Sequence, residues 1–249
     1  TPICNGNIVR IDANAAPPAT QSFTNLNNTH IPAGGTTTGV STPYPNTLAV
    51  AGLPATGVSV KSVTLTNFSH SFPDDVDIVL VSPTGQSVIL MSDAGGSADA
   101  TGQTFTLDDA AASFLADAAF NATGSYKPTN YGAGDSWPVV GSPTATTLST
   151  FTGNMNGNWS LYAFDDLTGD IGFLSTWTIT FNVLQPLVFS PLTNLYSDAG
   201  ATVAYTGTPT YTVWAKPAVT TTYTASTTLA GCSNSASVTI NVNQLPAIT

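Results

Sequence analysis

Aspartates are the side chains of this sequence most able to do chemistry, and they gather in one part of the chain. All 14 acidic residues are Asp, and 12 of them fall between residues 61 and 170 together with two Lys, so this region carries the whole net charge of -10. Converging carboxylates repel one another unless a cation neutralises them, and Ca²⁺, which takes about six to eight oxygen ligands, suits Asp in Gly-rich loops. We therefore expect Ca²⁺ as a cofactor. The alternative is that these Asp residues form turns by bonding their own backbone.

The candidate calcium ligands form two groups. The first surrounds a predicted hairpin and contains Asp74, Asp75, Asp77, Asp93 and Asp108 or Asp109, and the second lies in a later loop and contains Asp165, Asp166 and Asp170. Their spacing does not fit an EF-hand. An extracellular site of this kind would bind Ca²⁺ with a Kd on the order of 0.1 to 1 mM.

The other groups with chemical potential are few. His70 lies between Ser69 and Ser71, and a hydrolytic triad is one interpretation, but we favour a structural His at the end of a strand. Two His and two Cys at distant positions do not make a zinc site. Exposed aromatic residues can stack on sugars, so we treat three as candidate glycan contacts, with local packing under loops as the alternative: Tyr131, Trp137 and Trp214.

Composition predicts the elements that must position these groups. Only 7% of the residues are charged, against about 25% in a typical soluble domain, and Glu is absent. Thr, Ser, Asn, Gly and Pro fill the polar positions, which favours strands and turns, so we predict an all-β fold.

Four Lys and Arg are too few to bind nucleic acid. No apolar run approaches the roughly 18 residues of a membrane span, so we expect no membrane insertion. The N-terminus lacks the pattern of a signal peptide, so we expect a mature or trimmed product.

Apolar residues that alternate with polar ones, or that form short continuous runs, mark the predicted strands. Two continuous runs flank the turn at Pro83–Gly85 and predict a hairpin. We expect a bulge near Thr176, one short helical turn at most within residues 108–119, and little regular structure in residues 13–42. The predicted strands are Val58–Thr66, Val76–Val81, Ser87–Met91, Gln103–Leu107, Trp159–Phe164 and Leu174–Phe181.

The middle of the chain resembles the P domain, a jelly-roll β-sandwich that follows the catalytic domain of kexin-like and furin-like proprotein convertases and also occurs in bacterial surface proteins. The resemblance covers roughly residues 42–183. It implies a module without catalytic residues of its own and with Trp159 and Trp177 in its core, and P domains often bind calcium. The stretches that carry it are Asn67–Gly85, Leu90–Gly96, Asn156–Asp166 and Gly169–Phe181.

Residues 191–246 resemble the immunoglobulin-like repeats of large bacterial surface proteins, through Thr220–Thr224 and Gly231–Ile240. Such repeats often open with an Ile-Cys-x-Gly pattern, which Ile3–Gly6 matches. We therefore divide the chain into an N-terminal segment (1–41), a jelly roll (42–185) and an immunoglobulin-like module with a linker (186–249). One arrangement inserts the jelly roll into the immunoglobulin-like module.

The two cysteines, Cys4 and Cys232, lie near opposite ends of the chain. A disulfide between them would tie the first strand to the last module, as the inserted arrangement requires in an exported protein. Two free structural thiols are the alternative.

These features predict a non-enzymatic, calcium-stabilised structural or adhesive module of a secreted or cell-surface bacterial protein, similar in architecture to proteins exported by the type nine secretion route. Its expected partners are other surface proteins or copies of itself. The alternatives are a glycan-binding accessory module of a larger secreted enzyme and a P domain that supports a protease outside this chain.

Overall fold

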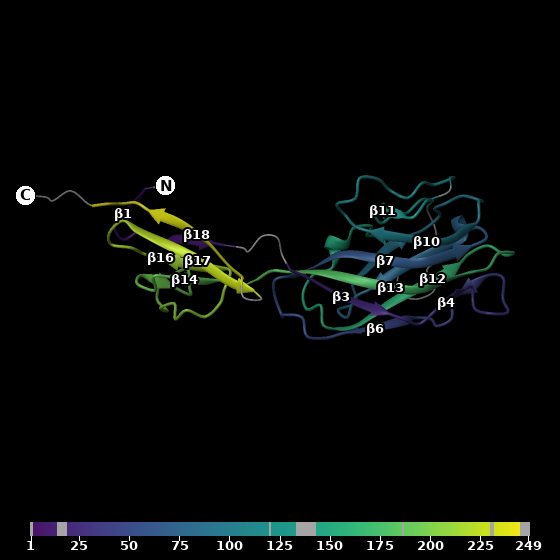
Figure 1. The fold of residues 1–249 in the computed structure, drawn as a ribbon, viewed down its shortest axis with the longest axis horizontal. Helices are drawn as coiled ribbons and strands as arrows, with labels where there is room; N and C mark the ends of the chain where they lie inside the picture. The colour runs from purple at the N-terminus through teal and green to yellow at the C-terminus, as the bar shows by residue number, and fades with distance from the viewer. Residues whose placement is uncertain are drawn as a thin grey trace, which may run out of the picture. The chain divides into compact units, whose positions relative to one another are not determined.

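The computed structural model describes residues 2–13, 19–119, 121–132, 143–185, 187–229 and 232–244. In this part of the chain the regular structure consists of nineteen strands and two short 3-10 helices, η1 (Pro73–Asp75) and η2 (Leu148–Thr150), so the predicted all-β fold is confirmed (Figure 1). The residues divide into two compact units. One comprises residues 20–183, and the other comprises residues 1–19 and 184–249.

The unit of residues 20–183 is a β-sandwich, called the sandwich below. Its first sheet has the order β11-β10-β7-β13-β3, with β4 also paired to β13, and its second has the order β5-β12-β8-β9, with β6 also paired to β12. The strands of the first sheet are β3 (Ala19–Asn25), β4 (Thr29–Ile31), β7 (Val58–His70), β10 (Ala100–Leu107), β11 (Gly124–Tyr126) and β13 (Gly172–Val183). Those of the second are β5 (Gly39–Val40), β6 (Asn46–Val50), β8 (Val76–Val81), β9 (Ser87–Met91) and β12 (Gly157–Asp165).

The sandwich core follows from the alternation seen in the sequence. Along β12, and along β13 from Trp177 onward, every second side chain points inward, and Trp159 and Trp177 are fully buried, as predicted. The ring centroids of Trp159 and Phe181 are 5.7 Å apart in an edge-on contact, an arrangement that aromatic pairs prefer. Truncating one of these large buried side chains would cost about 3 to 5 kcal/mol.

Several local predictions can be compared with the strands. The hairpin around Pro83–Gly85 is confirmed, because β8 and β9 pair in antiparallel fashion on either side of it. The ladder between β13 and β7 shifts register at Thr180–Phe181, where Lys61 of β7 is the extra residue, and not near Thr176. Described residues of 108–119 contain no helix. Residues 13–42, expected to be irregular, contain β3, β4 and β5, which pair with β13 and β12. Residues 20–41 therefore pack with the sandwich, whereas the sequence analysis placed them in a separate segment.

The second unit, called the split unit below, is formed from both ends of the chain, so the sandwich is inserted between its strands. It has sheets of order β14-β17-β18 and β15-β16-β2 and a pair β1-β19. A small core surrounds Phe189, Val213 and Tyr223. The strands are β1 (Ile3–Cys4), β2 (Val9–Asp12), β14 (Val188–Ser190), β15 (Leu195–Tyr196), β16 (Thr212–Ala215), β17 (Thr221–Leu229), β18 (Cys232–Ile240) and β19 (Val242–Asn243).

The predicted Cys4–Cys232 disulfide is not formed in this structure. Cys4 is an exposed free thiol, and its backbone pairs with Asn243. Cys232 pairs with Leu229 at the other end of β18, eight residues before Ile240. At roughly 3.3 Å per residue that stretch of strand spans about 26 Å, far more than the roughly 4 to 7 Å between the Cα atoms of a disulfide. Antiparallel pairing of β17 with β18 thus places the two cysteines apart.

Candidate functional site

The two groups of aspartates predicted from the sequence meet at one end of the sandwich. Strand β8 begins directly after η1, and its antiparallel partner β12 ends there, so Asp165 pairs with Val76 and Phe164 pairs with Asp77. The backbone N–H of Asp166 donates a hydrogen bond to the carbonyl of Asp75 at 3.1 Å. Pairing between strands that are about 85 residues apart in sequence therefore joins Asp75 to Asp165 and Asp166. We call this region, with Asp170, the acidic end.

Two carboxyl groups of the acidic end are buried. Asp75 is 5% exposed and Asp165 is fully buried. Burial raises the pKa of Asp75 to about 6, with further contributions from the charges of Asp166, Asp170, Asp74 and Asp93. Burial likewise raises the pKa of Asp165 to about 7, and the charges of Asp75, Asp170 and Asp166 add to the effect. The two buried carboxyls thus lie near other negative charges, and few neighbouring groups offset the resulting repulsion.

His70 lies directly against Asp165. Its Nε2 is 3.2 Å from Asp165 Oδ2, both side chains being fully buried, and its Nδ1 is 2.9 Å from the Phe72 carbonyl oxygen. Burial lowers the pKa of His70, although the Phe72 carbonyl and the charge of Asp170 oppose this shift. The Leu167 N–H lowers the pKa of Asp165 in part, yet Oδ1 of Asp165 has no hydrogen bond of standard geometry in the described part of the chain.

Gly172 makes room for this arrangement. A Cβ at Gly172 would lie 2.1 Å from the Ser69 carbonyl oxygen and 2.4 Å from Cδ2 of His70, distances at which atoms overlap. Only glycine therefore lets β13 approach β7 closely enough to hold His70 beside Asp165. The sequence analysis did not select Gly172. The signal present in the sequence is a glycine at the start of a strand that is otherwise apolar and polar in alternation.

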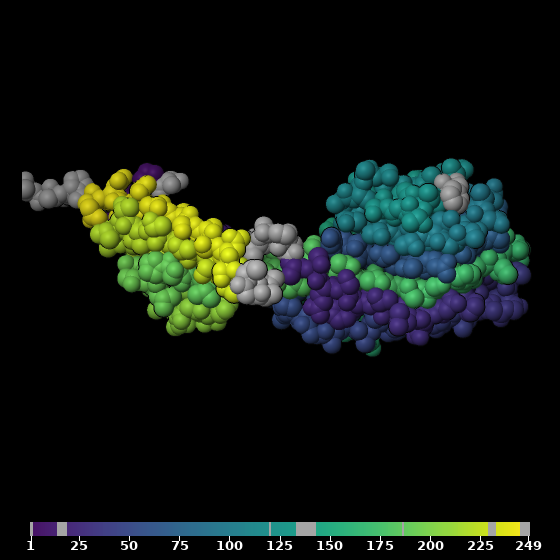
Figure 2. All heavy atoms as spheres, in the orientation of Figure 1, coloured from purple at the N-terminus to yellow at the C-terminus, as the bar shows by residue number. Residues whose placement is uncertain are grey.

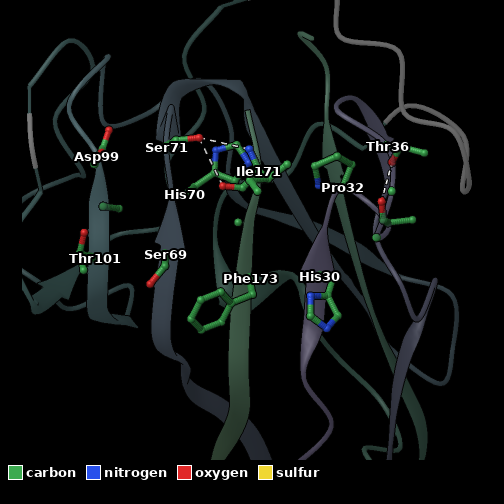
Figure 3. Close-up of a pocket in the computed structure, with 15 residues that line it drawn as sticks. His30, Pro32, Thr36, Ser69, His70, Ser71, Asp99, Thr101, Ile171 and Phe173 are labelled. Atoms are coloured by element: carbon green, nitrogen blue, oxygen red, sulfur yellow. Dashed lines mark hydrogen bonds between the residues drawn. The ribbon is translucent and has the colours of Figure 1, made fainter. Parts of the chain in front are cut away.

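An open hollow of about 390 Å³ lies on the outer face of the first sheet, next to His70. Neighbouring strands contribute Thr101, Ser69, Phe173 and His30 to it, and Figure 3 shows the rings of Phe173 and His30 near each other. The residues that line it are His30, Pro32, Ala33, Gly34, Gly35, Thr36, Ser69, His70, Ser71, Asp99, Ala100, Thr101, Ile171, Gly172 and Phe173.

The hydroxyls beside His70 are engaged elsewhere. Ser71 Oγ donates to Asp170 Oδ1 at 3.0 Å, and Ser69 Oγ accepts a hydrogen bond from the Gly102 N–H at 2.9 Å. The ring of His70 faces Asp165 and the Phe72 carbonyl. A Ser-His-Asp triad requires the His to bond the nucleophilic hydroxyl, and in this structure the His70 ring is not directed at either serine. His70 instead supports the buried carboxyl.

Asp108 and Asp109 are in a different environment from the acidic end. Asp108 Oδ1 accepts a hydrogen bond from the Ala110 N–H at 2.8 Å, closing a local turn. The two carboxylate oxygens of Asp109 accept from the N–H groups of Leu148 and Ser149 at 2.8 and 2.9 Å, at the start of η2. These carboxylates brace loops by bonding backbone, which is the alternative that the sequence analysis left open for Asp residues.

The remaining predicted metal ligands flank the acidic end. Asp77 is buried within β8. Asp74 Oδ1 accepts from the Gly96 N–H at 3.2 Å, and Asp93 Oδ2 accepts from the Ser92 hydroxyl at 3.1 Å. Asp74 and Asp93 both raise the pKa of Asp75, so their charges act on the acidic end.

The donor set of the acidic end fits a hard cation by its chemistry. Asp side chains offer only oxygen atoms as metal ligands, which Ca²⁺ prefers. In the described part of the chain, the buried Oδ1 of Asp165 has no hydrogen bond of standard geometry. Among the described residues, however, no group of three or more His, Cys, Asp or Glu side chains is arranged to hold a metal ion. The acidic end thus has the negative charge and the oxygen ligands that a calcium site needs. Its side chains do not converge on a single point in this structure.

Of the aromatic residues considered as glycan contacts, Tyr131 belongs to the sandwich and Trp214 to the split unit. Tyr131 packs against the sandwich core, and its hydroxyl donates to the Leu115 carbonyl at 2.8 Å. Trp214 is partly exposed on β16 of the split unit, opposite Tyr196. Trp137 lies outside the described residues. Local packing therefore accounts for Tyr131.

Comparison with known families supports the resemblance in part. The family model of the proprotein convertase P-domain matches residues 60–117, from β7 through the turn that holds Asp108 and Asp109. No curated protein matches the chain. No described helix has the length and apolar character needed to cross a membrane. The matched region is similar to a non-catalytic β-sandwich accessory domain that occurs in secreted proteins.

Proposed function

We propose that the sandwich is a non-catalytic accessory module of an extracellular or cell-surface protein and that Ca²⁺ stabilises its acidic end. The observation that carries the proposal is the burial of Asp75 and Asp165 beside like charges. The P-domain match at residues 60–117 supports the accessory role.

A bound Ca²⁺ would neutralise charges that otherwise repel one another. The residues proposed to hold it are Asp75, Asp165, Asp166 and Asp170, because Asp166 and Asp170 act electrostatically on both buried carboxyls. Ca²⁺ supplies positive charge and accepts carboxylate, carbonyl and water oxygens in a flexible geometry. Asp108 and Asp109 are left out of this set, since their oxygens already accept backbone hydrogen bonds.

The role of such a module is structural or adhesive in this proposal, with other surface proteins or further copies as partners. In this proposal the split unit is a bacterial immunoglobulin-like module. Its two small sheets, which share one core, support this assignment. A second candidate function follows from the family matched: the sandwich would support a proprotein-processing protease elsewhere in the same protein. A catalytic domain in a longer form of the protein would favour that second role.

Thermal unfolding with Ca²⁺ and with excess chelator tests the calcium proposal. At a Ca²⁺ concentration of about ten times Kd, one site adds roughly 1.4 kcal/mol by mass action, which raises Tm by about 3 to 6 °C in a domain of this size. Asp165→Asn should abolish the rise, because it removes one buried charge with little change in shape.

Asp109→Asn is the matched control for this experiment. It makes the same chemical change to a carboxylate that braces a loop, so the response to Ca²⁺ should persist. An unchanged Tm of the original chain in chelator would contradict the calcium proposal. A response lost in Asp109→Asn and kept in Asp165→Asn would place calcium elsewhere and contradict the proposed ligands.

A further inference from the structure

Strand β18 is a long edge strand of the split unit. The sheet has the order β14-β17-β18, so in the described part of the chain β18 has a strand on one side only. It pairs with β17 over nine consecutive residues, from Cys232 to Ile240, without a register shift. Residues 233–239 are exposed on both faces, and Figure 2 shows the yellow surface of this end of the chain open to view.

This edge lacks the features that usually keep strand edges from pairing. Natural edge strands are short, bulged or carry charges or proline. Strand β14 has three residues and β15 has two, and the edge strand β2 carries the ion pair of Arg10 and Asp12. The sequence of β18, CSNSASVTI, contains no charge and no proline, and its ladder has no bulge.

One face of β18 already takes part in rows of hydroxyl groups. Hydroxyls on β17 and β18 are hydrogen-bonded across the ladder: Thr222 with Thr239 at 2.8 Å, Thr224 with Ser237 at 2.8 Å and Thr228 with Ser233 at 2.9 Å. Such cross-strand hydroxyl pairs stabilise sheets. A further strand that presented Ser or Thr at matching positions would extend these rows.

The other face of β18 borders a largely apolar hollow of about 370 Å³ in the split unit. Ala236 and Val238 of β18 line it together with residues of β2, among them the charged pair Arg10 and Asp12. Val238 is 44% exposed. A strand added beside β18 would place its own inward side chains over this hollow and reduce the exposed apolar surface.

We propose that β18 pairs with β18 of a second copy of this chain, antiparallel and centred on Ala236. This register is self-complementary, as a two-fold interface requires. Ser235 then faces Ser237 of the partner subunit and Ser233 faces Thr239 of the partner subunit, so the hydroxyl rows continue across four strands. On the apolar side Ala236 faces its equivalent. Because β18 carries no charge, no like charges face each other along the paired edge. The proposal rests on the function proposed above, which includes further copies as partners, and assigns a surface to their pairing; it does not involve the acidic end, so the calcium proposal can fail while this one holds.

The oligomeric state of the whole chain tests the pairing. Sedimentation across a concentration series, with reducing agent to prevent bonds through Cys4 and with chelator to separate the result from calcium, should show a monomer–dimer equilibrium. The double variant Ser235→Lys with Ser237→Lys places two pairs of like charges face to face. We expect it to raise the dimer Kd by about tenfold or more.

Two comparisons make this test specific. Thr20→Lys with Ser22→Lys adds the same charges to two exposed hydroxyl residues of the edge strand β3 and should leave the Kd unchanged. A variant with Ser235→Asp and Ser237→Asp should not self-associate, but it should form a heterodimer when mixed with the Lys variant. A chain that stays monomeric at every concentration would overturn the proposal. Undiminished association of the Lys variant would do so too, as would failure of the mixture to pair. Circular dichroism of each variant verifies that the strands form.

Discussion

The acidic end and the turn at Asp108–Asp109 contain the same kind of side chain in two opposite situations. At the turn, each carboxylate accepts backbone N–H groups at 2.8 to 2.9 Å, so its negative charge has donors. At the acidic end, Asp75 and Asp165 are buried among further carboxylates, and their pKa values are raised. The comparison shows that the surroundings of an Asp, and not its frequency in the sequence, decide whether backbone donors compensate its charge or like charges surround it.

The largest expected effect breaks the packing that holds the acidic end together. Gly172→Ala would force a Cβ into the Ser69 carbonyl and the His70 ring, so strand β13 must shift and the contact of His70 with Asp165 must open. We expect a loss of about 3 kcal/mol in the free energy of unfolding, measured by urea denaturation. Gly34→Ala, on the rim of the same hollow with nothing within 4 Å of the added atom, is the control and should change stability by less than about 0.5 kcal/mol. Equal stabilities of the two variants would refute the close approach.

Removing a bracing carboxylate should have the next largest effect. Asp109→Ala leaves the N–H groups of Leu148 and Ser149 without their acceptor, at a cost of about 1 to 2 kcal/mol. Asp108→Ala removes the acceptor of one exposed N–H and should cost less. Both losses, read from urea denaturation, should be the same with Ca²⁺ and with chelator. A loss that appears only in Ca²⁺ would place Asp109 among the metal ligands.

The acidic end should make stability fall as pH rises in the absence of metal. Because the folded-state pKa values of Asp75 and Asp165 are about 6 and 7, above their ordinary value of 3.8, the folded chain keeps protons that the unfolded chain has released. The resulting stability is present at low pH and is lost as pH rises through 6 and 7. The lowered pKa of His70 acts in the opposite direction below its ordinary value of 6.5, but one imidazole is outweighed by two carboxyls.

Scanning fluorimetry in chelator between about pH 5 and pH 8 checks this dependence. We expect Tm to decrease toward higher pH, with a smaller decrease in Asp165→Asn and the original decrease in Asp109→Asn. Added Ca²⁺ should reduce the decrease by neutralising the ionised carboxylates. A Tm that climbs steadily over this range would show that the buried carboxyls are ionised throughout.

The smallest expected effect concerns an exposed carboxylate of the bracing kind. Asp198 accepts hydrogen bonds from the N–H groups of Thr202 and Val203 at 2.9 and 2.7 Å. Both bonds lower the pKa of Asp198, and the bond from Val203 has the larger effect. NMR titration should find the Asp198 pKa below its ordinary value of 3.8 and those of Asp75 and Asp165 above it. An Asp198 value above 3.8 would remove the distinction.

Local patterns in the sequence predicted the parts of the fold that depend on neighbouring residues. Continuous apolar runs on either side of a turn predicted β8 and β9, and imperfect alternation predicted β13, since the side chains of a strand point to opposite faces in turn. The burial of Trp159 and Trp177 was predicted from the P-domain resemblance. The joining of Asp75 to Asp165 depends on which strands pair, and composition does not specify that β8 lies beside β12. The P-domain resemblance includes both segments, but it did not predict their contact.

Other features were missed because they depend on distance in three dimensions. Gly172 matters through the approach of β13 to β7, which a single strand pattern does not show. The disulfide was predicted from the number and placement of the cysteines, but the ladder of β17 with β18 separates Cys232 from the strand that pairs with Cys4. The bonding of Asp109 to η2 joins residues about 40 apart in a region with little periodicity.

The insertion of the sandwich determines how the split unit must fold. Thr212 bonds to Asp12 across a separation of 200 residues, so closing that loop in an unfolded chain is entropically costly. Hydroxyl bonds of Ser22 with Thr180 and of Thr24 with Thr178 hold the first and last strands of the sandwich side by side. A sandwich that folds first therefore shortens the loop to about 40 residues and lowers the closure cost by roughly 1.5 kcal/mol. The split unit therefore gains part of its stability from contacts within the sandwich. A substitution that destabilises the sandwich core should also destabilise the split unit, which contains both ends of the chain.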